Sequence, residues 1–315
     1  FALLKGVPGG TAPWGAGRAA FLCPVPGYDR HFAICEEYGI EMIPVPLTGQ
    51  GPDLDTVERL AADPAVKGMW CVPRYSNPTA ETYSRETVGR LAAMKTGAPD
   101  FRLFWDNAYG AHHLTDARPE LANILEASAA AGNPNRALVF ASTSKMTFAG
   151  GGLAMVASSP DNVRWLCERL SKRTIGADKL NQLRHVRFLK DQAGIDRLMA
   201  AHRRLLAPKF AAVDAAFARR LEGAGVAAWT KPLGGYFICV DVLDGCAKRV
   251  VALARDAGIA LVPAGATFPH GRDPDDRNLR IAPSFPSLKD VAAAADGIAL
   301  CILLAATEKL LEGQK

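Results

Sequence analysis

The lysine at position 145 is the residue of this chain whose placement best suits covalent chemistry. It follows an apolar run, residues 137–141, and the polar sequence Ser142-Thr143-Ser144, and it precedes a glycine-rich segment, residues 150–152. The apolar run predicts a buried strand, so Lys145 would stand just past the carboxyl end of that strand. A lysine amine that has lost its proton is a nucleophile that forms an imine with an aldehyde. The alternative is an exposed loop lysine in a helix-capping turn.

Two apolar runs further upstream also end in polar side chains. Residues 103–105 are followed by Asp106 and, three residues later, by Tyr109, and residues 68–72 are followed by a turn that contains Asn77. In open α/β sheets, ligands bind in the crevice beyond the carboxyl ends of the strands. We therefore expect an amide, a carboxylate, a phenol, hydroxyls and a lysine to converge on one site.

This set of side chains suits pyridoxal 5'-phosphate (PLP), a cofactor held by a lysine Schiff base with an acidic partner for its pyridine nitrogen. Asp106 would hold the pyridinium proton, and Tyr109 and Asn77 would bond the phenolic oxygen. Taken singly, each residue has an ordinary alternative: a helix cap for Asp106, a packed aromatic for Tyr109 and a turn before Pro78 for Asn77. Their occurrence after successive predicted strands favours the cofactor site.

The elements that position these residues alternate between strand-like and helical patterns. Such alternation predicts an α/β fold with a mostly parallel sheet covered by helices on both faces. The expected strands are residues 20–23, 41–45, 68–72, 103–105, 137–141 and 153–157, and the expected helices are residues 28–38, 54–62, 85–95 and 120–131.

After Asp161 the chain becomes helical and then forms a second α/β unit. Helical spacing predicts a helix over residues 196–223, kinked or restarted at Pro208. We predict a large domain, residues 1–204, with a sheet of the seven-stranded type, and a smaller C-terminal α/β domain, residues 205–315. In the smaller domain we expect strands within 229–242, 259–262 and 279–282 and helices over 250–258 and 288–311.

The composition is that of a globular protein: 315 residues, 49% hydrophobic and 22% charged, with a net charge of +5. The basic residues are spread over predicted helices, which favours solvated helix faces over a nucleic-acid surface. The seven cysteines show no CxxC pair and no metal-ligand spacing. We therefore expect no metal site, and free thiols in a reducing compartment, the cytoplasm.

The chain shows no targeting pattern that we can read. No apolar run approaches the roughly 20 residues of a membrane span, and the start lacks a secretory signal pattern. We therefore expect no membrane partner. The sequence begins at Phe1 rather than at a methionine, and we expect an amino-terminal segment to be missing.

Six short motifs lie along nearly the whole chain. They are Tyr28-Asp-Arg-His31, Asn77-Pro78-Thr79, Asp106-x-x-Tyr109, Ser142-x-Ser144-Lys145, Gly234-Gly235-Tyr236-Phe237 and Leu279-Arg280-Ile281. Their order and approximate spacing resemble the fold-type I PLP-dependent aminotransferases, the aspartate aminotransferase superfamily. The sequence around these motifs, including Asn181-Gln-Leu-Arg-His185, is similar to that of a bacterial branch of aspartate or MocR-like aminotransferases.

The resemblance implies a role for each matching residue. Lys145 would form the Schiff base with PLP and carry protons between the substrate Cα and the cofactor. Arg280, together with Asn77, would bind the substrate α-carboxylate, with the guanidinium as a bidentate fork. The other implied cofactor contacts are Asp106 at the pyridine nitrogen with His31 behind it, Tyr28 on the ring face, Asn77 and Tyr109 at the phenolic oxygen, and Ser142 and Ser144 at the phosphate.

Three departures from the family pattern stand out. Leu153 occupies the position at which many relatives carry a phosphate-binding arginine. The family's first phosphate-binding turn would lie before Phe1. The arginine that reads an acidic substrate side chain has no clear counterpart, although Lys179, Arg184 and Arg187 lie in the corresponding region.

The resemblance implies a ping-pong aminotransferase that pairs L-aspartate, or another amino acid, with 2-oxoglutarate. It also implies a homodimer with its sites at the interface. Two alternatives stay open: a PLP-dependent lyase or decarboxylase at the same site, and the effector domain of a MocR-like, PLP-sensing transcription regulator.

Overall fold

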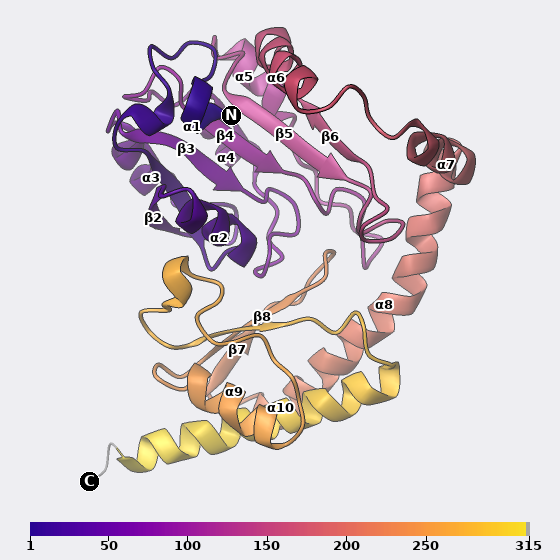
Figure 1. Ribbon diagram of the computed structural model, residues 1–315. Helices are drawn as coiled ribbons and strands as arrows, with labels where there is room; N and C mark the ends of the chain where they lie inside the picture. The colour runs from indigo at the N-terminus through magenta and orange to yellow at the C-terminus, as the bar shows by residue number, and fades with distance from the viewer. Residues whose placement is uncertain (313–315) are drawn as a thin grey trace.

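The computed structural model describes residues 1–312, which form two α/β units joined by a long helix (Figure 1). The larger unit is built on a six-stranded sheet of order β2-β1-β3-β4-β5-β6, and the smaller on a three-stranded sheet of order β7-β8-β9. The neighbours in the large sheet are parallel, except that β6 runs antiparallel to β5. The predicted α/β class with a mostly parallel, helix-covered sheet is confirmed, with six strands in the described residues where a seven-stranded type was expected.

The elements of the larger unit follow the predicted alternation closely. Its strands are β1 (Ala20–Val25), β2 (Glu41–Pro46), β3 (Val66–Cys71), β4 (Arg102–Asp106), β5 (Ala137–Ser142) and β6 (Ala154–Ala157). Its helices are α1 (Ala2–Lys5), the 3₁₀ turn η1 (Trp14–Ala16), α2 (Asp29–Glu37), α3 (Leu54–Ala61), α4 (Arg85–Ala93), α5 (Ile124–Ala130), α6 (Pro160–Arg173) and α7 (Lys179–Leu189).

Each face of the large sheet has its own apolar core, because successive side chains of a strand point to opposite faces. On one face, Leu22 and Leu103 pack with residues of α3, α4 and α5. On the other, Phe21 and Phe104 pack with residues of η1 and α2. Phe21 lies edge-on to Phe104, with 5.2 Å between the ring centroids. With both faces buried, only the strand ends remain for ligands.

The carboxyl ends of β3, β4 and β5 open on the same edge of the sheet. The parallel registers pair Cys71 with Trp105 and Asp106 with Phe140. The loops that follow these strands therefore lie beside one another and, in Figure 1, face the smaller unit.

The smaller unit packs its sheet against helices. Its elements are β7 (Ala227–Trp229), β8 (Ile238–Val242), β9 (Asn278–Ile281), α9 (Ala247–Asp256), the 3₁₀ turn η2 (Pro269–Gly271) and α10 (Leu288–Glu312). The long helix α8 (Gln192–Leu221) links the units and runs without a break through Pro208. The predicted domain boundary at residue 205 falls inside α8 and stays a prediction.

The strand predicted at residues 259–262 is wrong. This segment has no regular secondary structure, because β9 occupies the edge of the small sheet beside β8. Ile259 and Leu261 instead pack their side chains onto the core of the smaller unit. An apolar run that fills a groove beside a helix has the same pattern as a short strand.

Helix α10 corrects the expectation that no segment could span a membrane. By length and composition alone it is apolar enough to do so. In the structure, one face of α10 is buried, with Ile298 and Ile302 in the core of the smaller unit. A buried core helix satisfies the same length and hydropathy criteria as a membrane span.

Several contacts besides α8 join the two units. On one side the backbone of residues 233–235 bonds to the turn at residues 112–114, through Leu114 N–H to Leu233 O and Gly235 N–H to His112 O. On the side of α2, Gly27 N–H donates to Thr267 O, and His270 Nδ1 lies 3.1 Å from Glu36 Oε1.

Candidate active site

Lys145 lies in the turn after β5, and contacts from both units hold its backbone. Its carbonyl oxygen accepts hydrogen bonds from the Tyr236 hydroxyl (3.0 Å) and from His112 Nε2 (3.3 Å). Burial lowers the pKa of His112 to about 4, so the ring is neutral and carries its proton on Nε2. The Nζ atom of Lys145 lies 5.2 Å from the centroid of the Tyr109 ring.

Asp106 ends β4 and is held by a histidine. His31 Nε2 lies 3.1 Å from Asp106 Oδ2. The buried imidazole stacks on the Trp70 indole, with 4.3 Å between centroids and 9° between planes. The stack fixes the imidazole and, through it, one carboxylate oxygen of Asp106. The structure thus brings His31 and Asp106 together, as the family resemblance implies.

Two tyrosines, Tyr109 and Tyr28, lie near this pair. Tyr109 is buried, and burial is the main cause of its raised pKa, with Tyr28 and the carboxylate of Asp106 adding to it. It is therefore a hydrogen-bond donor at neutral pH. Tyr28 precedes α2 and meets His31 edge-on, with 5.1 Å between ring centroids.

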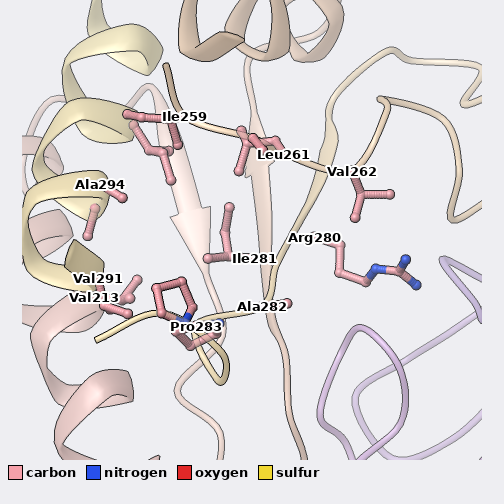
Figure 2. Close-up of a pocket in the computed structure, with 14 residues that line it drawn as sticks. Val213, Ile259, Leu261, Val262, Arg280, Ile281, Ala282, Pro283, Val291 and Ala294 are labelled. Carbon is pink, nitrogen blue, oxygen red and sulfur yellow. The ribbon is translucent and has the colours of Figure 1, made fainter. Parts of the chain in front are cut away.

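Arg280 reaches the site from the smaller unit. Figure 2 shows its guanidinium pointing away from the apolar pocket in which its neighbour Ile281 lies, as the alternation of a strand requires. Its Nη1 donates to Asn77 Oδ1 (3.2 Å) and Asp29 Oδ1 (2.9 Å). The guanidinium carbon lies 5.1 Å from the centroid of Phe237.

Of the two predicted phosphate-binding serines, Ser142 ends β5 and Ser144 lies in the turn that carries Lys145. Ser144 N–H donates to Ser142 Oγ at 3.4 Å. The returning chain passes so close that a Cβ at Gly152 would lie 2.5 Å from Ser144 Oγ. Glycine is therefore required at position 152 for this turn to close.

Helix α7 braces the same turn through the Asn181–His185 motif. His185 Nδ1 lies 2.9 Å from the carbonyl of Asn181, so Nδ1 carries the proton and Nε2 accepts. Nε2 lies 2.9 Å from Thr143 Oγ1, which also accepts from Leu153 N–H. The Asn181 amide donates to Gly151 O at 3.0 Å. Both ends of the lysine turn are thus tied to one helix.

Among the described residues, no hydrogen bond or ion pair joins Lys179, Arg184 or Arg187 to Arg280 or Lys145. Leu153 bonds to the turn through its backbone: its N–H donates to Thr143 Oγ1, and its carbonyl accepts from Thr143 N–H. Lys179 begins α7 and Arg187 lies near its end. Arg184 lines a cavity of about 310 Å³ beside Met146 and Phe148, adjacent to the lysine turn.

The residues present fit the predicted cofactor. Asn77 is buried, yet its Nδ2 has no hydrogen-bond partner among the described residues, and the same is true of Arg280 Nε. Buried donors without partners are costly unless a ligand satisfies them. In residues 1–312, no cluster of three histidine, cysteine or acidic side chains could hold a metal ion.

Sequence reasoning missed three residues of this site. His112 and Tyr236 hold the Lys145 carbonyl. In the sequence, His112 is marked only by the neighbouring histidine, and Tyr236 only by its place in the Gly-Gly-Tyr-Phe motif. Asp29, which binds Arg280, was passed over inside the Tyr28–His31 motif. Each acts through a contact between segments far apart in the chain.

Comparison with known proteins gives consistent matches. The family described as "Aspartate amino-transferase" matches residues 1–315. A Mycolicibacterium smegmatis protein named as an aminotransferase is 56% identical over 313 residues, covering 99% of this chain and 73% of that protein. The aspartate aminotransferase of Corynebacterium glutamicum is 50% identical over 297 residues, 94% of this chain and 69% of that protein. A crystal structure of an aspartate transaminase from C. glutamicum superposes with a TM-score of 0.96 at 48% identity, over 98% of this chain and 73% of that one.

Proposed function

Because this chain belongs to the aspartate aminotransferase family, we propose that it moves an amino group from L-aspartate to 2-oxoglutarate, with Lys145 as its catalytic lysine. Members of this family are PLP-dependent transaminases, and the chain is such an enzyme. The similarity to the C. glutamicum aspartate aminotransferase supports aspartate as the donor. Neither the lyase or decarboxylase alternative nor the regulator alternative has support among these relatives.

The observation that carries the proposal is the convergence of Lys145, Asp106 and Arg280 around Tyr109. Asp106 ends β4, Tyr109 follows β4, and Lys145 follows the neighbouring parallel strand β5. Arg280 comes from β9 of the smaller unit. The charges of Asp106 and Arg280 are both close enough to act on the pKa of Tyr109, the carboxylate raising it and the guanidinium lowering it. A nucleophile, an acid partner and a carboxylate-binding cation are the groups that amino-acid transamination requires.

When bound, PLP supplies an electron-accepting ring that stabilises negative charge at the substrate Cα. Asp106 would hold the proton on the pyridine nitrogen, and His31 keeps its carboxylate in place. Asn77 Nδ2 and the Tyr109 hydroxyl would donate to the phenolic oxygen. The remaining cofactor contacts that we propose are Tyr28 against the ring and the hydroxyls of Ser142 and Ser144 at the phosphate.

The chain's own proton chemistry centres on Lys145. Its Nζ would hold the cofactor between turnovers and, once freed by the substrate amine, would remove the Cα proton. The bonds from Tyr236 and His112 to its carbonyl fix the backbone from which Nζ reaches. Arg280 would bind the substrate α-carboxylate and so orient the Cα–H bond.

An absorbance titration tests the catalytic role directly. The protein with PLP should show a band at about 360–430 nm that moves to about 330 nm on adding L-aspartate. Lys145→Ala should lose the covalently bound form and at least about 100-fold in kcat, the range expected for a general base. Lys179→Ala is the control, since that lysine is exposed on α7. An unchanged rate in Lys145→Ala would remove the lysine from its proposed role.

Product analysis tests the substrates separately. Incubation with L-aspartate and 2-oxoglutarate should give oxaloacetate and glutamate in equal amounts. If the absorbance band shifts with another amino acid but not with aspartate, the protein is still a transaminase, and that amino acid replaces aspartate as the proposed amino donor. Release of product without a 2-oxo acid acceptor would point to a lyase or decarboxylase.

We also propose a homodimer. Its support is an exposed apolar surface on α7, which carries Leu180, Leu183, Val186 and Phe188 beside the turn of Lys145. Light scattering of the purified protein would measure the mass. The buffer is kept reducing because we also propose a cytoplasmic location. A monomeric mass at micromolar concentration would contradict this assignment.

A further inference from the structure

The guanidinium of Arg280 is already engaged by a second carboxylate, that of Asp29. Its Nη1 donates to Asp29 Oδ1 at 2.9 Å and to Asn77 Oδ1 at 3.2 Å. The Arg280 side chain is only 9% exposed, whereas that of Asp29 is 45% exposed. The contact crosses from β9 of the smaller unit to α2 of the larger one.

These two bonds determine which edge of the guanidinium is free. Nη1 carries two protons, and Asp29 and Asn77 accept one each. A bidentate carboxylate needs two parallel N–H groups on one edge. The edge formed by Nε and Nη2 still has two parallel N–H groups free for a carboxylate. Nε is a buried donor without a partner among the described residues.

Asp29 is well placed to hold this orientation. It is the first residue of α2, where the helix dipole favours a negative charge. On the same helical turn, His31 binds Asp106, and Tyr28 stands just before the helix. The start of α2 therefore aligns the acid partner of the ring and the carboxylate-binding cation at once.

We propose that Asp29 is a positioning residue for Arg280: by occupying Nη1 it directs the α-carboxylate of the substrate to the Nε–Nη2 edge. The inference rests on the proposed role of Arg280 as the α-carboxylate site. Asp29 also supplies a counter-charge to a buried guanidinium before substrate arrives. Because Asp29 is nearly half exposed, water screens its repulsion of the incoming carboxylate, and its orienting effect prevails.

The test compares Asp29→Ala, Asp29→Asn and Glu36→Ala in the PLP-loaded enzyme. Glu36 is the matched control: it lies on α2, is also 45% exposed and binds His270 of the smaller unit, but it does not touch Arg280. Asp29→Ala should raise KM for both the amino acid and the 2-oxo acid about tenfold, with kcat within about threefold. Asp29→Asn keeps an accepting oxygen and should raise KM less. Glu36→Ala should leave both constants unchanged.

A binding measurement adds a readout that does not depend on turnover. The dissociation constant of succinate, a dicarboxylate without an amino group, is measured by calorimetry. It should rise in Asp29→Ala by the same factor as KM. If Asp29→Ala is poorly folded, Asp29→Ser replaces it, because serine suits a helix start but is too short to reach Nη1.

The outcomes separate this proposal from its rivals. A lower KM in Asp29→Ala would mean that Asp29 competes with the substrate for Arg280. An equal rise of KM in Asp29→Ala and Glu36→Ala would contradict the proposal, because it would mean that any contact between the two units supports substrate binding. If aspartate proves not to be the donor, the same variants are assayed with the amino acid that reacts. If Arg280→Ala leaves KM and succinate binding unchanged, the positioning proposal fails while the transaminase assignment stands.

Discussion

The carboxyl group of Glu81 is a buried acid that the active site does not use. It lines a cavity of about 570 Å³ between the two units. Its Oε2 accepts from Gly49 N–H, while its Oε1 is buried and has no hydrogen-bond partner within residues 1–312. Burial raises the pKa of Glu81 from 4.5 to about 7, because the charged form loses its hydration.

This shift predicts a pH-dependent stability. Between pH 4.5 and about 7 the folded protein holds a proton on Glu81 that the unfolded chain has lost, so stability falls as pH rises through this window. Glu81→Gln removes the penalty and should stabilise the protein above pH 7 by at most ~3 kcal/mol. At pH 4.5 the two proteins should be equal. Denaturant unfolding across this range measures the difference.

The control is Glu86→Gln, an exposed glutamate at the start of α4. It should show no pH-dependent difference from the parent. A stabilisation by Glu81→Gln that is the same at pH 4.5 and pH 8 would contradict the titration and point to a packing effect.

A second prediction at the scale of single residues concerns His31. Its imidazole is fixed by the stack on Trp70 and by Asp106. His31→Ala should loosen the carboxylate of Asp106, weaken PLP binding about tenfold and lower kcat to a similar extent, since a hydrogen bond to a charged group is worth ~1.5–3 kcal/mol. PLP titration by absorbance and steady-state kinetics measure both. His270→Ala, which removes an exposed histidine, should change neither; an unaltered PLP affinity in His31→Ala would count against its support of Asp106.

At the scale of elements, α7 acts on the turn that holds Lys145. His185 is buried at 7% exposure and binds Thr143, and Asn181 binds Gly151. His185→Ala should lower kcat about tenfold, because the turn that holds Lys145 loses its support. It should also lower the melting temperature by a few degrees, because losing a hydrogen bond costs ~1 kcal/mol of unfolding free energy. His185→Gln can still accept from Thr143 and should recover part of kcat.

A control for α7 distinguishes bracing from helix stability. Asp178 caps α7 through Asn181 N–H, and Asp178→Ala should cost ~1 kcal/mol of stability. If Asp178→Ala lowers kcat as much as His185→Ala, the effect belongs to the helix as a whole. If it lowers stability alone, the effect belongs to the contact with Thr143.

What could be predicted from the sequence depended on how local each feature is. The six strands of the large sheet, and the positions of Asp106 at the end of one strand and of Lys145 and Asn77 in the segments after two others, followed from apolar runs. The contacts of Arg280 with Asp29 and of Tyr236 with Lys145 span 251 and 91 residues. Periodicity contains no information on such separations. The segment 259–262 was misassigned because burial against a helix and pairing in a sheet select the same apolar residues.

At the scale of the whole molecule, α10 closes the smaller unit. Ile298 is 3% exposed in its core, whereas Leu300 on the opposite face is 46% exposed. Ile298→Ala should therefore cost about 2–5 kcal/mol, and Leu300→Ala less than ~0.5 kcal/mol. Urea unfolding of the two variants measures this contrast. Equal, small costs would contradict the burial of α10 in a protein core.

The three attachments between the units have a consequence for motion. A body held at three points that do not lie on one line cannot rotate until one of them is released. The helix α8 is continuous chain, and the 112–114 and 233–235 segments share backbone bonds. The attachment at α2 consists of one backbone bond, the exposed pair Glu36–His270 and the contact of Arg280 with Asp29. The axis of any opening rotation therefore runs through the first two. Such a rotation carries Arg280 away from Asp29, so the carboxylate-binding edge is oriented only when the two units are closed.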